Sequence, residues 1–179
     1  MSPKLTVIDS QIAGISGDML LGALIDAGAT PETVHTTLKL IPQHFPRCES
    51  LRLQTREVRK HGFRACLVDF TISERDEETR AEELIDTAHE IAKASNLGDR
   101  AKSFAVAAIQ VLTDVESKLH GVEISKTHLH EAGSTDTLAD IFGEMDAQLS
   151  KEKITTDELK DKQGLLTGCE KYELNRAIA

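Results

Sequence analysis

Two histidines and several carboxylates lie close together in the segment 128–140. His128 and His130 are separated by one residue and are followed by Glu131 and Asp136. Side chains alternate along an extended backbone, so both imidazoles would point the same way. Imidazoles with carboxylates suit a borderline divalent metal such as nickel, zinc or iron, and the spacing is not the HExxH of zinc proteases. The segment therefore predicts a metal or catalytic site; the structural alternative is a polar loop that only caps the next helix.

A glycine-containing turn forms the second candidate. It has the sequence GISGD, from Gly14 through Ser16 and Gly17 to Asp18, and stands between an expected strand and an expected helix. Backbone N–H groups and the positive end of the helix dipole meet at such a junction, which favours an anion. Glycine also lets the backbone approach a ligand closely. The spacing matches neither a P-loop nor GxGxxG, so the alternative is a tight turn with an acidic cap.

The expected secondary structure places both segments at helix ends. Period-two alternation predicts a hairpin of two strands, 50–59 and 63–73, with Lys60-His61-Gly62 at its turn. Asp136 and Asp140 would share one face of the last helix, because they are four residues apart. A further strand is expected at 4–9, and helices at about 18–27, 30–40, 79–95, 99–119 and up to 149.

Two of these helices carry more detailed signals. Thr79 and Glu82 have the spacing of a capping box, which predicts a helix start there. The helix at 99–119 has one apolar stripe, and such a stripe ordinarily faces the core. Its members are Phe104, Ala108, Val111, Val115 and Leu119.

Composition narrows the class of protein. The chain has 179 residues, 40% of them hydrophobic, and a net charge of −9, which indicate a soluble globular protein of one domain or two small ones. The acidic balance and 3% aromatic content argue against nucleic-acid binding. No apolar run is long enough for a membrane span, and the first residues lack a signal-peptide pattern. Cys48, Cys66 and Cys169 show no CxxC spacing, which predicts free thiols in a reducing cytoplasm.

Together the elements predict an α+β fold. We expect a small antiparallel or mixed sheet, with helices packed mostly on one side of it and a helix-rich second half. Residues 1–149 would form this domain, and 150–179 a divergent polar tail.

Both candidate segments resemble the hallmarks of one family. The stretch IAGISGDMLLGAL at 12–24 is similar to the N-terminal motif of the LarC family, the nickel insertion proteins of nickel-pincer cofactor synthesis. So are HGV at 120–122 and HLHEAGSTDTLADI at 128–141, and the family has a similar strand–turn–strand between the two motifs. The resemblance covers about residues 4–143 and identifies residues 1–149 as a LarC-like N-terminal domain.

The resemblance implies an activity. Family members insert nickel into pyridinium-3,5-bisthiocarboxylic acid mononucleotide in a CTP-dependent reaction that forms Ni–S and Ni–C bonds, a chelatase or cyclometallase activity of the lyase class. Nickel would then be held by His128, His130, Glu131 and Asp136. The substrate phosphate would be held by Gly14, Ser16 and Gly17, although Asp18 would repel it unless a cation mediates. Catalytic roles would fall to Asp18, Glu131 and Asp136.

The sequence also departs from the family. Family proteins are longer, and their C-terminal domain, which carries the site for CTP and a divalent metal, has no counterpart here. After Gly143 the segment 144–148, EMDAQ, replaces an apolar helix. Whether the chain is an enzyme is therefore left open. The alternatives are a nickel-binding module or split subunit that needs a separate C-terminal partner, an inactive remnant, and a phosphate-ester hydrolase. Expected partners are the mononucleotide, a C-terminal LarC domain or subunit, and a second copy in a homo-oligomer, with neither nucleic acid nor membrane.

Overall fold

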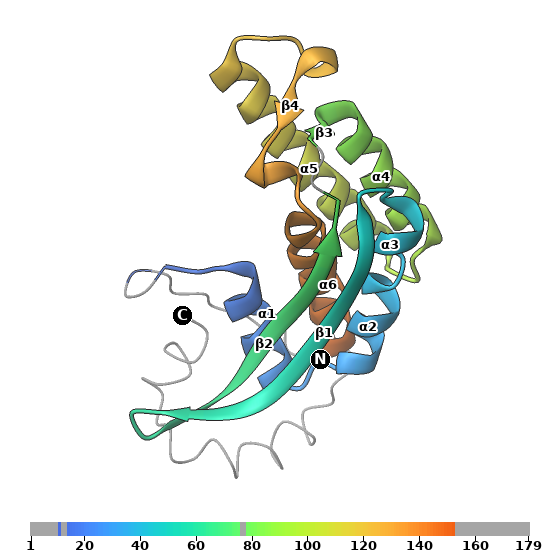
Figure 1. Cartoon of the computed structure of the whole chain (residues 1–179). Coiled ribbons are helices and arrows are strands. Elements are labelled where there is room, and N and C mark those ends of the chain that lie inside the picture. The colour runs from blue at the N-terminus through green and yellow to red at the C-terminus, as the bar shows by residue number, and fades with distance from the viewer. Residues whose placement is uncertain (1–10, 12–13, 76–77, 153–179) are drawn as a thin grey trace.

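The computed structural model describes residue 11 and the ranges 14–75 and 78–152. The expected strand at 4–9, Cys169 and the tail beyond residue 152 lie outside the described residues. Figure 1 shows a long two-stranded hairpin that curves across the front of a group of helices. The elements are α1 (Gly17–Asp26), α2 (Pro31–Leu38), α3 (Ile41–His44), β1 (Cys48–Lys60), β2 (Phe63–Glu74), β3 (Thr79–Arg80), α4 (Ala81–Ala94), α5 (Asp99–His120), η1 (Ile124–Lys126), β4 (His128–Leu129), η2 (Glu131–Gly133) and α6 (Thr135–Glu152).

The predicted hairpin is confirmed. Strands β1 and β2 pair antiparallel, from Cys48 opposite Glu74 to Lys60 opposite Phe63. The two residues between them, His61 and Gly62, have φ of 52° and 88°. Two successive positive φ values are typical of the tight turns whose twist matches that of paired strands, and they fix the register of the whole hairpin.

A second, much shorter ladder joins distant parts of the chain. Strands β3 and β4 pair antiparallel, with Thr79 opposite Leu129 and Arg80 opposite His128. Both described sheets are thus antiparallel, and the α+β class is confirmed. The ladder brings Thr79 and Arg80 against the histidine segment.

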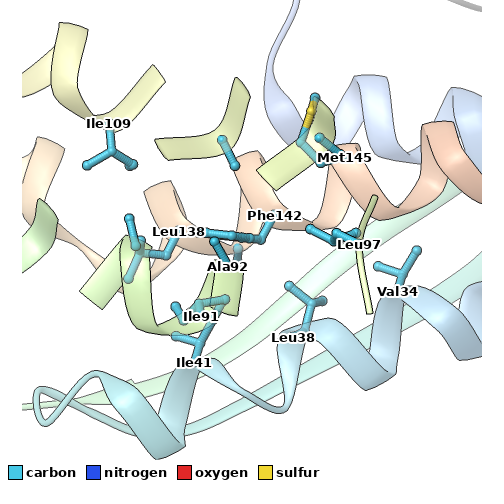
Figure 2. Close-up of a cluster of buried hydrophobic side chains, with 14 of the residues drawn as sticks. Val34, Leu38, Ile41, Ile91, Ala92, Leu97, Ile109, Leu138, Phe142 and Met145 are labelled. Carbon is cyan, nitrogen blue, oxygen red and sulfur yellow. The ribbon is translucent and has the colours of Figure 1, made fainter. Parts of the chain in front are cut away.

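Helix α6 runs through the middle of the core. It packs against α1, α2 and α5, while α1 lies on β2. Figure 2 shows Leu138 and Phe142 of α6 among apolar side chains from α2, α3 and α4. A Cβ atom at Gly22 of α1 would lie 2.6 Å from the backbone oxygen of Cys66, so glycine lets α1 approach the strand closely. Burial of these side chains supplies the main driving force for the fold.

The predicted capping box at Thr79 is wrong. Thr79 is a strand residue, and α4 begins at Ala81 with Arg80 as its N-cap and no side-chain cap. The Thr79 hydroxyl instead donates to the backbone oxygen of Gly133 at 2.9 Å. The Thr79 hydroxyl, which the local pattern assigned to the helix N-terminus, therefore binds a residue that is distant in the sequence.

The predicted core stripe of α5 is also wrong. The buried residues of α5 are Ala101, Ala105, Val106, Ile109 and Thr113. Small side chains at Ala101 and Ala105 let this face pack closely, and the Thr113 hydroxyl is satisfied by the backbone oxygen of Ile109 at 3.0 Å. The larger stripe that includes Phe104 and Leu119 is exposed instead.

Helix α6 continues past Gly143, and Met145 and Ala147 of segment 144–148 are buried.

Among the described residues, no helix is both long and apolar enough to cross a membrane.

Candidate functional site

The glycine turn and the start of α6 meet directly. A Cβ atom placed on Gly17, the first residue of α1, would lie 2.0 Å from Cγ of Asp140 and 2.2 Å from its Oδ2. No side chain fits there unless the carboxyl group moves. The fold therefore brings together the two segments that the sequence singled out, although they are more than a hundred residues apart.

The turn itself is built around Asp18. The Asp18 carboxylate accepts a hydrogen bond from the Ser16 hydroxyl, and its Oδ1 accepts one from the Met19 N–H at 2.8 Å. Gly14 has φ of 71°, a conformation that favours glycine. Ser16, the N-cap of α1, makes no side-chain hydrogen bond to the helix backbone. Ser16 and Asp18 are both exposed, so the turn is open to solvent.

Four carboxyl groups, Asp18, Asp136, Asp140 and Glu144, form what we call the acidic cluster. Burial raises the pKa of Asp140 to about 7, and the charges of Asp136 and Asp18 add to the effect. Burial and the charge of Asp140 raise the pKa of Glu144 to about 7. The pKa of Asp136 is also raised, by burial and by Asp18 and Glu74.

Asp140 and Glu144 of the acidic cluster are therefore poised to exchange protons near neutral pH. Asp140 Oδ1 is buried and has no hydrogen-bond partner. Closely placed carboxyl groups that share a partly buried site retain protons, and a bound cation would release them.

The histidines lie at a separate place, which we call the histidine cluster: His120, His128, His130 and Glu78. The Nδ1 atom of His128 lies 3.3 Å from Glu78 Oε2, and the Nδ1 atom of His130 lies 3.9 Å from Glu78 Oε1. The rings of His120 and His130 have centroids 6.3 Å apart. Both motif histidines face one carboxylate, as expected if the backbone there is extended; His128 and Leu129 form β4.

The predicted ligand set is thus divided in space. His128 and His130 face Glu78, whereas Asp136 belongs with Asp18 and Asp140. The backbone of Glu131 opens η2, and its side chain lies outside the described residues. Within the part of the chain that the structure describes, no three His, Cys, Asp or Glu side chains are arranged to hold a metal ion as they stand.

Several contacts hold the segment between β4 and α6, which links the two clusters along the chain. Glu74, at the end of β2, accepts the N–H of Thr135 at 3.0 Å and pairs with Arg47 at 2.9 Å. Burial alone would raise the pKa of Glu74, but the hydrogen bonds from Thr135 and the charge of Arg47 outweigh it and the pKa is lowered. A Cβ atom at Gly133 would lie 2.7 Å from Cβ of Leu129. These contacts fix the loop between β4 and α6.

Sequence reasoning missed Glu78 and His120 as members of the histidine cluster. Glu78 reaches the histidines only through the long-range ladder of β3 and β4, for which two-residue strands give no sequence signal. His120 belongs to the HGV motif, yet its position at the end of α5 suggested only a helix cap. Its Nε2 also lies 3.5 Å from Glu116.

Neither of the two cysteines that the structure describes belongs to either cluster. Cys48 is buried and Cys66 half-buried, and both are free thiols. Burial raises the pKa of each, so neither is predisposed to the thiolate form that binds metals.

Comparison with known proteins settles the family. The family described as nickel insertion protein matches residues 6–170. The chain belongs to this family. The resemblance to the LarC family, inferred from the glycine turn and the histidine segment, is confirmed.

Individual nickel insertion proteins show the same relationship over only part of their length. A putative nickel insertion protein of Methanothermobacter thermautotrophicus is 32% identical over 169 residues, which are 91% of this chain and 39% of the relative. One of Rhodopirellula baltica is 36% identical over 132 residues, 74% of this chain and 31% of the relative. The pyridinium-3,5-bisthiocarboxylic acid mononucleotide nickel insertion protein of Staphylococcus saprophyticus is 31% identical over 148 residues, 83% of this chain and 35% of the relative. The chain thus spans less than two fifths of these relatives, and no solved structure matches it.

Proposed function

We propose that this chain takes part in nickel insertion into pyridinium-3,5-bisthiocarboxylic acid mononucleotide. The observation that carries the proposal is the direct meeting of the family's two motifs, where Gly17 packs against Asp140. A turn suited to an anion then lies beside carboxyl groups suited to a cation. Such a site can bring a phosphorylated substrate and a metal ion together.

Nickel would enter at the histidine cluster. The two Nδ1 atoms of His128 and His130 lie 3.3 and 3.9 Å from the two oxygens of Glu78, so small side-chain rotations would bring nitrogen and oxygen donors onto one ion. Imidazole and carboxylate together suit Ni²⁺. Glu131, the next residue in the motif, would be a further ligand, and we propose that Asp136 receives the ion on its way to the substrate.

The mononucleotide phosphate would bind at Gly14, Ser16 and Gly17. Asp18 would repel it, but a cation at the acidic cluster would offset that repulsion. When nickel replaces hydrogen on a carbon atom, the released proton needs an acceptor. We assign this catalytic role to the carboxylates of Asp18, Glu131 and Asp136, since carboxylates within reach of a released proton serve as general bases.

The parts of the activity that depend on CTP belong to a second component in this proposal. By family resemblance, CTP and its divalent metal are bound by a C-terminal domain, and this chain would supply nickel and substrate binding to it. The complete assembly would act as a nickel chelatase or cyclometallase of the lyase class in the cytoplasm. A non-catalytic nickel-binding module or split subunit is the alternative.

The test is a calorimetric nickel titration of the full chain beside the double variant His128→Ala/His130→Ala. We expect binding in the wild type that the double variant loses. The control His89→Ala changes an exposed histidine on α4 and should bind as the wild type does. Absence of binding in the wild type, or binding that survives the double substitution, would contradict the assignment. Cofactor metallation with and without CTP and an added C-terminal fragment of a relative then separates enzyme from module.

A further inference from the structure

Helix α5 carries a second apolar face that no described element covers. We call it the α5 outer face: Phe104, Val111, Val115 and Leu119 of the helix, with Val122 two residues past its end. Phe104, Val111 and Leu119 are 60%, 62% and 75% exposed. Single exposed apolar residues are ordinary, but a continuous row of them marks an interaction surface.

The spacing of this face indicates what kind of surface would cover it. Within α5, Phe104, Ala108, Val111, Val115 and Leu119 follow one another at intervals of four, three, four and four residues. Apolar residues at such intervals are typical of a helix that packs against another helix. The side of α5 that packs in the fold is a different one, facing α4 and α6.

The charges along α5 distinguish between partner orientations. Its first turn holds Asp99, Arg100 and Lys102, a net charge of +1, and its last turns hold Asp114, Glu116 and Lys118, a net charge of −1. Two copies of α5 packed antiparallel would set the basic end of each against the acidic end of the other. A parallel pair would set like charges together.

We propose that a second copy of this chain docks on the α5 outer face, with the two α5 helices antiparallel about a twofold axis. Such an isologous contact needs one self-complementary patch, and α5 provides it. Five residues with exposed fractions of 41–75% supply the apolar surface of this contact in each copy. A stable interface buries about 800 Å² per partner, so flanking residues must contribute and the dimer is reversible.

The inference is independent of the proposed function. The ring of His120 lies 6.3 Å from that of His130, and none of the substitutions made on the outer face changes a residue of the histidine cluster. Nickel binding and dimer formation should therefore respond to different substitutions.

Sedimentation equilibrium of the full chain over roughly 1–200 µM, a range that spans micromolar dissociation constants, tests the proposal. We expect a wild-type dimer, and we expect Val111→Asp/Leu119→Asp to weaken it by about 100-fold or more because it buries unpaired charge. Phe63→Asp, on another exposed aromatic at the hairpin tip, is the matched control and should dimerise as the wild type does. Circular dichroism checks that each variant is folded. A monomeric wild type, or a double variant that still dimerises, would overturn the proposal.

Cysteine cross-linking tests the orientation. The midpoint of the outer face lies near Val111 and Val115, so Val111→Cys should form a disulfide-linked dimer under mild oxidation. Phe104→Cys should not form one. Position 104 lies about nine residues from that midpoint, and at 1.5 Å per residue the two cysteines of an antiparallel pair would be about 27 Å apart. The wild type corrects for its own cysteines. Equal cross-linking at both positions would rule out the antiparallel arrangement.

Discussion

The ionisation of Asp140 should make the stability of the fold depend on pH. Its pKa is raised from 3.8 to about 7, so the native state binds the proton more tightly than the unfolded chain does. The folded protein is therefore penalised as pH rises from 3.8 toward 7, and the penalty is complete above 7. At 1.36 kcal/mol per pKa unit this corresponds to about 4 kcal/mol, which solvent screening of a half-buried group reduces to about 1–2 kcal/mol.

The substitution Asp140→Asn removes the charge and keeps the shape. We expect it to stabilise the protein by about 1–2 kcal/mol at about pH 8 and to change little at about pH 4, where the native carboxyl is already protonated. Urea unfolding at both pH values measures the difference. Asp86→Asn, on the exposed side of α4, is the matched control and should have no such pH dependence. An equal effect at both pH values, or a loss of stability at pH 8, would refute this account of the cluster.

Three other substitutions test the connections around the site. Gly17→Ala should destabilise the fold by about 1–3 kcal/mol because the new methyl group displaces the Asp140 carboxyl, and Asp140→Ala should restore most of that loss in a double-mutant cycle by urea unfolding. Glu74→Gln should lower the free energy of unfolding by about 2 kcal/mol in the same assay, since it weakens charged hydrogen bonds to Arg47 and to the first residue of α6. An unchanged urea midpoint would argue against a stabilising role for these hydrogen bonds. Glu78→Gln should weaken nickel binding about 10-fold in calorimetry, and undiminished affinity would remove Glu78 from the histidine cluster.

The sequence predicted well what depends on neighbouring residues. The hairpin followed from alternation and from the His61-Gly62 turn. The family followed from two motifs. These features are encoded within a few residues of one another, so no knowledge of tertiary contacts was needed.

What failed depends on tertiary contacts. Helix α5 has two apolar faces, and the sequence cannot say which of them meets the core; the smaller one does, because Ala101 and Ala105 allow closer packing. Thr79 fitted a capping box until Gly133 supplied a better partner for its hydroxyl. Glu78 gave no signal at all, since only a two-residue ladder carries it to the histidines.

Strand β2 gives none of its side chains to either cluster, yet it sets the spacing within one of them. Arg64 of β2 grips Asp26 at the end of α1 at 2.7 Å, and Glu74 holds the first residue of α6. In Figure 1 this strand passes α1 and α6, and it contacts both helices. One continuous strand thus holds both α1 and α6. The distance between Asp18 and Asp140 therefore depends on contacts that lie outside the site. A substitution at Arg64 would loosen the position of α1 relative to α6, although every residue of the acidic cluster would be unchanged.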